Sequence, residues 1–241
     1  MDVNLILPFI SSAVMLAFVV AVLYRWRSRR HGHMILWAVG LTMFGIGSFA
    51  EAASVIGWNN TVFKSWYLFG AMLNAGWIGQ GTFYLLAKRR IANVALAIIV
   101  GVSLIGAYGV IVLPLDPTEF STDVSLAESF REIMPDGTWV RKITPLFNIY
   151  GLFALVGGAI YSAWLFWRKR SHPNRMWGNI LIAIGALSIG FASTLTRLGN
   201  GDYLYLGELI AAAFMFAGFL VSSQPVKARA PQSRPVAAPA N

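Results

Sequence analysis

The sequence predicts an all-α integral membrane protein, folded as a bundle of seven transmembrane helices. Of its 241 residues, 57% are hydrophobic and only 12% are charged, about half the charged fraction of an ordinary soluble domain. The apolar residues fall in runs of about twenty, the helix length that crosses roughly 30 Å of hydrocarbon. Alternating segments of about ten residues, typical of transmembrane β-barrels, are absent.

Seven apolar segments predict the spans, and short turns join all of them except the fourth and fifth. The first begins after Asp2 and ends at a basic run without a small-residue cleavage site, so we expect a retained span and not a secretory signal. The spans are expected at about 3–24, 34–56, 62–87, 91–113, 143–167, 176–196 and 203–222. They form a transmembrane domain, 1–223, followed by a Pro-, Ala- and Arg-rich tail, 224–241, expected to be disordered.

Charge is distributed unevenly over the connecting segments. Most of the 19 basic residues follow the first, third and fifth spans or lie in the tail, where no acidic residue occurs. The positive-inside rule then places the N-terminus outside and the C-terminus in the cytoplasm, across a bacterial plasma (inner) membrane. The basic rims are expected to contact anionic lipid headgroups of the bilayer. No other basic surface is present, so nucleic acid is not an expected partner.

Small residues recur at every fourth position in three spans, a pattern typical of closely packed membrane helices. They are Ala71, Ala75 and Gly79, then Ala154, Gly158 and Ser162, then Ala186, Gly190 and Thr194. A Trp followed by basic residues and His ends both the first and the fifth spans. This leaves open whether two three-helix repeats are joined by the fourth span.

The outer loop, 114–142, is acidic and contains three prolines. Asp123 is expected to cap a short helix with an apolar face made of Val124, Ala127, Phe130 and Met134. Such a helix would be either a lid over a site or a helix packed on the outer end of the bundle.

Polar side chains within the predicted spans gather at one depth. Ionisable groups are costly in a bilayer and often mark function. Two acids and an amide lie about five residues, roughly 8 Å, below the outer interface, and two cations lie near outer span ends. The candidate ligand-binding residues are Glu51, Glu208, Arg197, Asn148, Asn74 and Lys64. We expect Glu51 or Glu208 to pair with Arg197 or Lys64, either fixing helix register or lining a pocket open to the outside.

No motif for an enzyme or a cofactor is present. The chain has no Cys, which excludes disulfides and thiolate metal sites. No Lys lies mid-span for a retinal Schiff base, and no His or Asp lies within a span for haem ligation or proteolysis. These absences do not exclude catalysis, but we expect no catalytic residue, cofactor or metal.

The first span ends in Tyr24-Arg25-Trp26-Arg27, the second contains Trp37, Gly40 and Glu51, and the third opens with Trp66-Tyr67-Leu68-Phe69-Gly70. With the outside N-terminus, this pattern over residues 1–90 resembles the seven-helix sensory input region of bacterial histidine kinases. The resemblance implies signal transduction. No kinase, cyclase or other output domain is recognisable after residue 223, so signalling is expected to need a protein partner that binds the basic loops or the tail.

The leading hypothesis is therefore a non-enzymatic membrane sensor or receptor with a polar site in the outer third. Two alternatives stay open. A small-solute transporter built from two repeats would need a polar path through the inner half as well. An accessory subunit of a larger membrane complex would need a lipid-facing stripe of small or polar residues on some helix.

Overall fold

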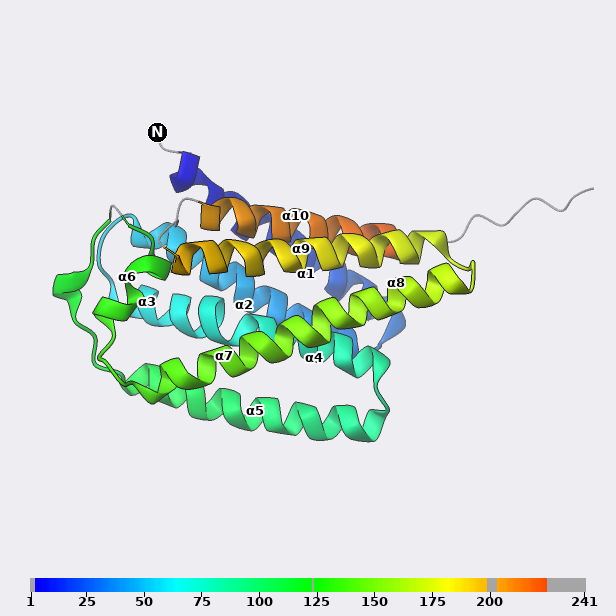
Figure 1. Cartoon of the computed structure of the whole chain (residues 1–241), viewed down its shortest axis with the longest axis horizontal. Coiled ribbons are helices and arrows are strands. Elements are labelled where there is room, and N and C mark those ends of the chain that lie inside the picture. Colours follow the sequence, from blue (N-terminus) through cyan, green and yellow to red (C-terminus); the bar gives the residue numbers. More distant parts are fainter. Residues whose placement is uncertain (1–2, 123, 199–202, 225–241) are drawn as a thin grey trace, which may run out of the picture.

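The computed structural model is an all-helical bundle (Figure 1). It describes residues 3–122, 124–198 and 203–224, which contain no strand, and at 3–5 and 197 it describes the backbone alone. The elements are α1 (Val3–Arg29), α2 (Gly32–Ser54), α3 (Asn60–Ser65), π-helix η1 (Trp66–Leu73), α4 (Asn74–Leu86), α5 (Arg89–Val112), the 3-10 helix η2 (Pro117–Glu119), α6 (Leu126–Ile133), α7 (Trp139–Leu152), π-helix η3 (Phe153–Gly157), α8 (Gly158–Arg168), α9 (Pro173–Arg197) and α10 (Leu204–Ser223). Apart from Gln224, the tail expected to be disordered lies outside the described residues.

Six helical segments are long and apolar enough to cross a membrane, which supports the predicted multi-pass membrane protein. They are Ile6–Arg29, Gly32–Ser54, Arg89–Val112, Trp139–Arg168, Pro173–Thr196 and Leu204–Ser223. The predicted third span, 62–87, is helical from Asn60 to Leu86 but is divided into α3, η1 and α4. None of these three pieces reaches a spanning length alone, so the count of seven stays a prediction.

Helix α2 packs against η1 and α4 with almost no space between the backbones. A Cβ atom on Gly47 would lie 2.3 Å from the Cα of Gly70, and one on Gly40 would lie 2.6 Å from the backbone nitrogen of Ile78. Contacts this short are possible only because these positions lack a side chain. The two glycines of α2 therefore fix how closely the second helix approaches the 60–86 segment.

The predicted small-residue stripes of the third and fifth spans face each other. A Cβ on Gly79 would lie 2.7 Å from the Cα of Gly151 and 3.2 Å from the Cβ of Ala154. The stripe on α9 is not covered by another helix at Gly190, because a Cβ on this residue would have no atom within 4 Å. Helix α9 instead packs on α10 where Gly178 meets Gly218.

The two ends of the bundle differ in charge, as the sequence pattern predicts (Figure 1). The basic end comprises the α1–α2, α4–α5 and α8–α9 connections and the last turn of α10, on the right of the view. The acidic end carries the 113–138 connection, which contains η2 and α6. Helix α5 lies at the edge of the bundle, beside α4, η1 and α7.

Helix α6 and its flanking loops form a cap on the acidic end. Its N-cap is Ser125, which makes a capping box with Glu128; the predicted cap, Asp123, lies outside the described residues. Phe130 packs against the rings of Trp66 and Tyr67, with centroids 6.2 and 6.0 Å away. The expected apolar face was partly wrong. Val124 precedes the helix and is exposed, whereas Leu126, Ile133 and Met134 are buried.

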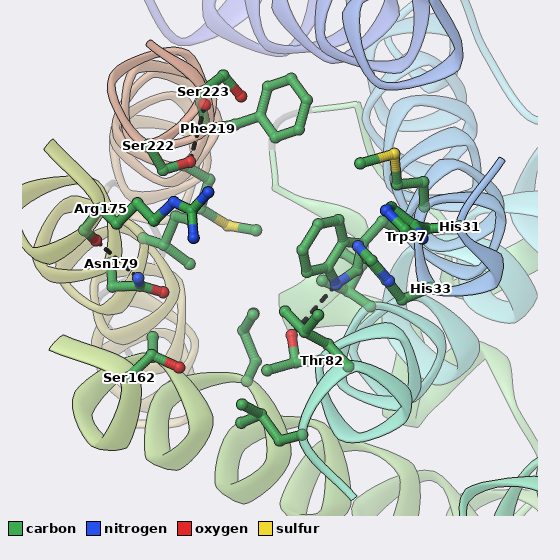
Figure 2. A pocket seen from close by; sticks show the side chains of 18 of the residues that line it. His31, His33, Trp37, Thr82, Ser162, Arg175, Asn179, Phe219, Ser222 and Ser223 are labelled. Atoms are coloured by element: carbon green, nitrogen blue, oxygen red, sulfur yellow. Dashed lines mark hydrogen bonds between the residues drawn. The ribbon is translucent and has the colours of Figure 1, made fainter. Parts of the chain in front are cut away.

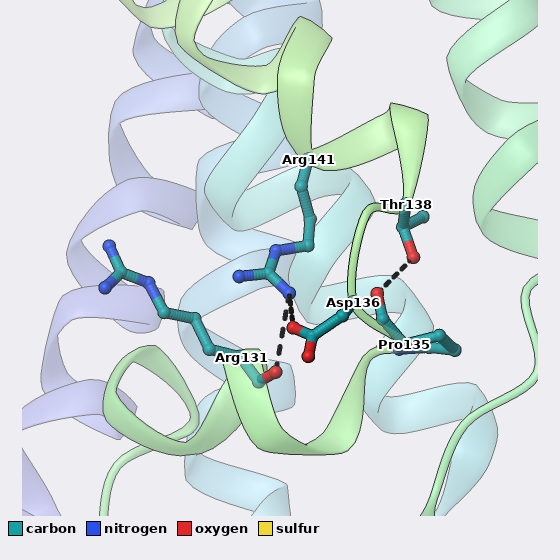
Figure 3. Close-up of polar contacts among 5 residues, drawn as sticks. All are labelled: Arg131, Pro135, Asp136, Thr138 and Arg141. Atoms are coloured by element: carbon teal, nitrogen blue, oxygen red, sulfur yellow. Dashed lines mark hydrogen bonds and ion pairs between the residues drawn. The ribbon is translucent and has the colours of Figure 1, made fainter.

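Arg141, in the first turn of α7, holds the C-terminal side of this cap (Figure 3). Its Nη1 lies 3.7 Å from Oδ1 of Asp136 and donates to the carbonyl oxygen of Arg131 at 3.4 Å. The Thr138 hydroxyl donates to the carbonyl oxygen of Pro135 in the same turn. The cap is thus held on the bundle by its buried apolar side chains and by the contacts of Arg141 with the turn that follows α6.

We expect Gly47→Ala to destabilise the bundle by about 1–3 kcal/mol, because the added methyl group would overlap Gly70 and force α2 away from η1. Thermal unfolding of the purified protein in detergent measures the loss. Gly190→Ala is the matched control, since its methyl group meets open space and Ala favours a helix over Gly by about 0.5–1 kcal/mol. Equal stability of the two variants would contradict the close contact.

Phe130→Ala should loosen the cap, because it removes the ring that α6 places against Trp66 and Tyr67. We expect trypsin to cleave after Arg131 about tenfold faster, since cleavage follows the population of the open form. Mass spectrometry of the fragments identifies the bond. Glu119→Ala, at an exposed position of η2 and away from the cleaved bond, should leave the rate unchanged; an unchanged rate in Phe130→Ala itself would show that this ring does not hold the cap.

Candidate functional site

Two predicted site residues, Glu51 and Glu208, come together near the acidic end, and we call them the carboxyl pair. Glu51 lies in α2 and is 1% exposed, and Glu208 lies in the second turn of α10 and is partly buried. Ser48, one turn before Glu51, donates its hydroxyl to Oε2 of Glu208 at 3.1 Å. The two carboxyl groups are close enough to interact electrostatically.

The Glu51 carboxyl group has no hydrogen-bond partner among the described residues. Both of its oxygens are fully buried. The Trp66 indole is near enough to interact with the carboxyl group but is not in hydrogen-bonding geometry. A buried polar atom without a partner costs free energy, and such an atom in a native structure calls for a specific explanation, such as an ion or a ligand.

Aromatic rings stand beside the carboxyl pair. Tyr205 lies one turn before Glu208 in α10. Its hydroxyl group interacts electrostatically with Glu51, with Glu208 and with Glu128 of the cap. Trp66 stands on the η1 side of Glu51 and packs under Phe130 of the cap. The pair therefore lies between α2, α10 and η1 below the cap, with the aromatic side chains of Trp66 and Tyr205 as its neighbours.

The π-helix η1 positions Trp66, and two contacts from α7 support it. The hydroxyl groups of Tyr67 and Thr144 are 3.0 Å apart, and Nδ2 of Asn148 donates to the carbonyl oxygen of Ala71 at 3.0 Å. A π-helical turn shifts the regular backbone bonds, and such turns occur often at functional sites. Asn148 thus acts on the backbone of η1 and does not reach the carboxyl pair.

The other predicted site residues do not join the pair in the described structure. Nζ of Lys64 donates to the carbonyl oxygen of Ile111 at 2.7 Å, at the C-terminal end of α5, where a cation is favourable. Oδ1 of Asn74 accepts from the backbone N–H of Ala75 at the start of α4. The side chain of Arg197 is outside the described residues. The expected ion pair between Lys64 and a carboxyl group is therefore not formed.

A second feature, which the sequence analysis missed, is a cavity of about 410 Å³ at the basic end (Figure 2). An adjoining cavity of about 470 Å³ shares Arg25, Arg29 and Arg175 with it. Basic residues after a span predict headgroup contact, and nothing in their spacing shows that the helices separate there. The cavity ends at Leu41 of α2 and Met215 of α10, well short of the carboxyl pair.

The helix faces between cavity and pair are filled by apolar side chains. Along α2, buried Phe44 lies between Leu41 and Ser48; along α10, the fully buried Ala211 and Ala212 lie between Met215 and Glu208. We call Leu41, Phe44, Ala211, Ala212 and Met215 the apolar plug. It separates a carboxyl site at one end from a basic cavity at the other.

The carboxyl pair is suited to a compact cation more than to catalysis. Two carboxyl groups and a hydroxyl group supply oxygen ligands, and the aromatic side chains of Trp66 and Tyr205 lie close by. No group of three or more His, Asp or Glu side chains able to hold a metal ion occurs in the described part of the chain. Comparison of the chain with family models, with curated proteins and with solved structures finds no match.

Proposed function

We propose that the chain is a non-enzymatic membrane sensor or receptor in which the carboxyl pair is the responsive site. The observation that carries this proposal is the buried Glu51 carboxyl group without a hydrogen-bond partner, beside Glu208. A compact cation, either an alkali ion or a small ammonium ion, would offset one of the two negative charges and would bind the free oxygens. Its binding energy would then be available to change the contact between α2 and α10.

The path from the site to the opposite end runs along α10. This helix packs against α1 and α9, and at its last residue the carbonyl oxygen of Ser223 accepts a bond from Nη1 of Arg25 at 3.2 Å. A shift of α10 at Glu208 therefore reaches the basic end through a helix that touches two others. The basic connections and the tail are the surfaces that a cytoplasmic signalling partner would contact.

The proposal includes seven spans, with Asn60–Leu86 as the third, the N-terminus outside and the C-terminus in the cytoplasm. It is supported by the charge difference between the two ends of the bundle. The likeness of residues 1–90 to histidine kinase input regions agrees with a sensor of the cell envelope in a bacterial plasma membrane.

A transporter is the second candidate, because the basic-end cavity and the carboxyl pair lie along the same faces of α2 and α10. The apolar plug counts against it, since the side chains that α2 and α10 present to each other between the two features are apolar. An accessory subunit is favoured by one observation: Gly190 and Thr194 of α9 leave a small-residue face uncovered. Cation binding without transport distinguishes a receptor from both alternatives.

Glu51→Gln and Glu208→Gln should each abolish stabilisation by compact cations, because each removes one of the two charges. Thermal unfolding of the purified protein in a neutral detergent measures the stabilisation. The Tm in sodium, ammonium or methylammonium chloride is compared with the Tm in tetraethylammonium chloride at equal ionic strength. We expect one compact cation to raise the Tm of the parent by a few degrees, corresponding to about 1–3 kcal/mol.

The matched control is Glu132→Gln, which alters an exposed acid of the cap and should keep the full shift. A parent protein that responds to none of the three salts would overturn the cation site. So would a shift that persists undiminished in both pair variants.

Because the chain has no Cys, single cysteines report topology directly. We expect Glu119→Cys, at the acidic end, to react with a membrane-impermeant maleimide in intact bacterial cells. Ser28→Cys and Ala87→Cys, at the basic end, should react only after lysis. Since Ser28 precedes α2 and Ala87 follows α4, labelling of these two from opposite sides would show that Asn60–Leu86 does not span the membrane.

A further inference from the structure

Three arginines line the cavities at the basic end without any acid to neutralise them. Arg25 and Arg29 lie in the last turns of α1, and Arg175 lies in the first turn of α9. Arg29 and Arg175 are near enough to Arg25 to repel its charge. No Asp or Glu lines either cavity, and the one ion pair in the described residues lies at the other end of the bundle.

The guanidinium groups keep most of their hydrogen-bonding capacity. Arg25 donates one bond, to the carbonyl oxygen of Ser223 at 3.2 Å. Arg175 makes a cation–π contact with the Phe166 ring, 5.9 Å from its centroid, and projects into the cavity in Figure 2. Clustered arginines with free N–H groups bind phosphate and carboxylate anions by charge-assisted, often bidentate, hydrogen bonds.

The interior of the cavity of about 410 Å³ is apolar, in contrast to its mouth. Its deeper walls are formed by buried or partly buried side chains of α1, α2, α4, η3, α9 and α10, among them Phe18, Leu41, Ile78, Leu155, Ile182, Met215 and Phe219. His33 and Trp37 stand on the wall opposite Arg175 (Figure 2). The Trp37 indole is occupied, because it donates to the Thr82 hydroxyl at 3.2 Å. A volume of about 410 Å³ is that of a small-molecule site.

We propose that this cavity binds an anionic amphiphile, with its phosphate or carboxylate headgroup at Arg25, Arg29 and Arg175 and its acyl chain against the apolar walls. An anionic headgroup complements the positive charge of the three arginines. The chain's own tail carries Lys227, Arg229 and Arg234 and no acid, so the three arginines would repel it. This site is distinct from the carboxyl pair, and the apolar plug lies between the two. An experiment can therefore contradict one proposal without affecting the other.

The test is a thermal-shift titration of the full-length protein in a neutral detergent with four probes. Myristoyl lysophosphatidic acid should raise the Tm in a saturable way. Monomyristoylglycerol has the same chain without the charge, inorganic phosphate has the charge without the chain, and hexanoyl lysophosphatidic acid has a short chain. We expect each of these three to bind at least about tenfold more weakly.

Arg175→Gln and Arg25→Gln should each weaken binding of the myristoyl probe about tenfold, because each removes a charge-assisted contact. The matched control is Arg168→Gln, at the end of α8. This arginine belongs to the same basic end and stacks on Trp164 but does not line either cavity. Its substitution should leave the affinity unchanged.

Three results would overturn the proposal. Equal loss of affinity in Arg168→Gln would show general attraction of the lipid to the basic rim. Equal binding of inorganic phosphate would show a site for a free anion, with no role for the acyl chain. Equal binding of the uncharged monoglyceride would show that the arginines do not recognise the headgroup.

Discussion

The close contact of α2 with η1 is the constraint on which the rest of the structure depends. Gly47 and Gly70 bring two helix backbones together with no side chain between them. The same and the adjoining faces of α2 present Leu41, Phe44, Ser48 and Glu51 toward the interior. If the contact were wider, Trp66 would move away from Glu51 and the bond from Ser48 to Glu208 would have to reach further. Both ends of the bundle thus depend on glycine packing near its middle.

The burial of Glu51 is the least favourable feature of the described interior. An unpaired carboxyl group in an apolar environment costs several kcal/mol unless it is neutralised. The charge of Glu208, which acts on this carboxyl group, has the same sign and does not offset the cost. A residue chosen for stability alone would be apolar at this position. A buried acid pair under a cap is therefore better explained by something that binds there than by packing.

Periodicity and charge predicted much of the architecture. Runs of about twenty apolar residues correspond to six long helices, and the basic and acidic connections separate to opposite ends as expected. The sequence could not predict that a π-helix divides the third segment, because this depends on tertiary contacts such as those from Thr144 and Asn148. A short helix in this loop, beginning after Asp123, was expected; the helix observed runs over 126–133 and its N-cap is Ser125.

The site was predictable only in part. Common depth correctly grouped Glu51 with Glu208, because α2 and α10 present them at the same level. The same criterion wrongly suggested that Lys64 pairs with them, since depth says nothing about which way a helix faces, and Lys64 faces the end of α5. No feature of the sequence indicated the cavity at the basic end. Arginines that line a cavity and arginines that face headgroups have the same spacing after a span.

The two candidate sites are related by the helices that they share. Glu208 and Phe219 are on α10, and Glu51 and Leu41 are on α2, so ligands at opposite ends would act on the same pair of helices. Any coupling between them would pass through the apolar plug, whose side chains are already buried and cannot move independently. Such coupling is reciprocal: if a cation at the carboxyl pair altered the affinity for an anionic amphiphile, the amphiphile would alter the affinity for the cation by the same factor. An apolar plug between two ends of opposite charge is therefore suited to transmitting a change in helix position from one end to the other.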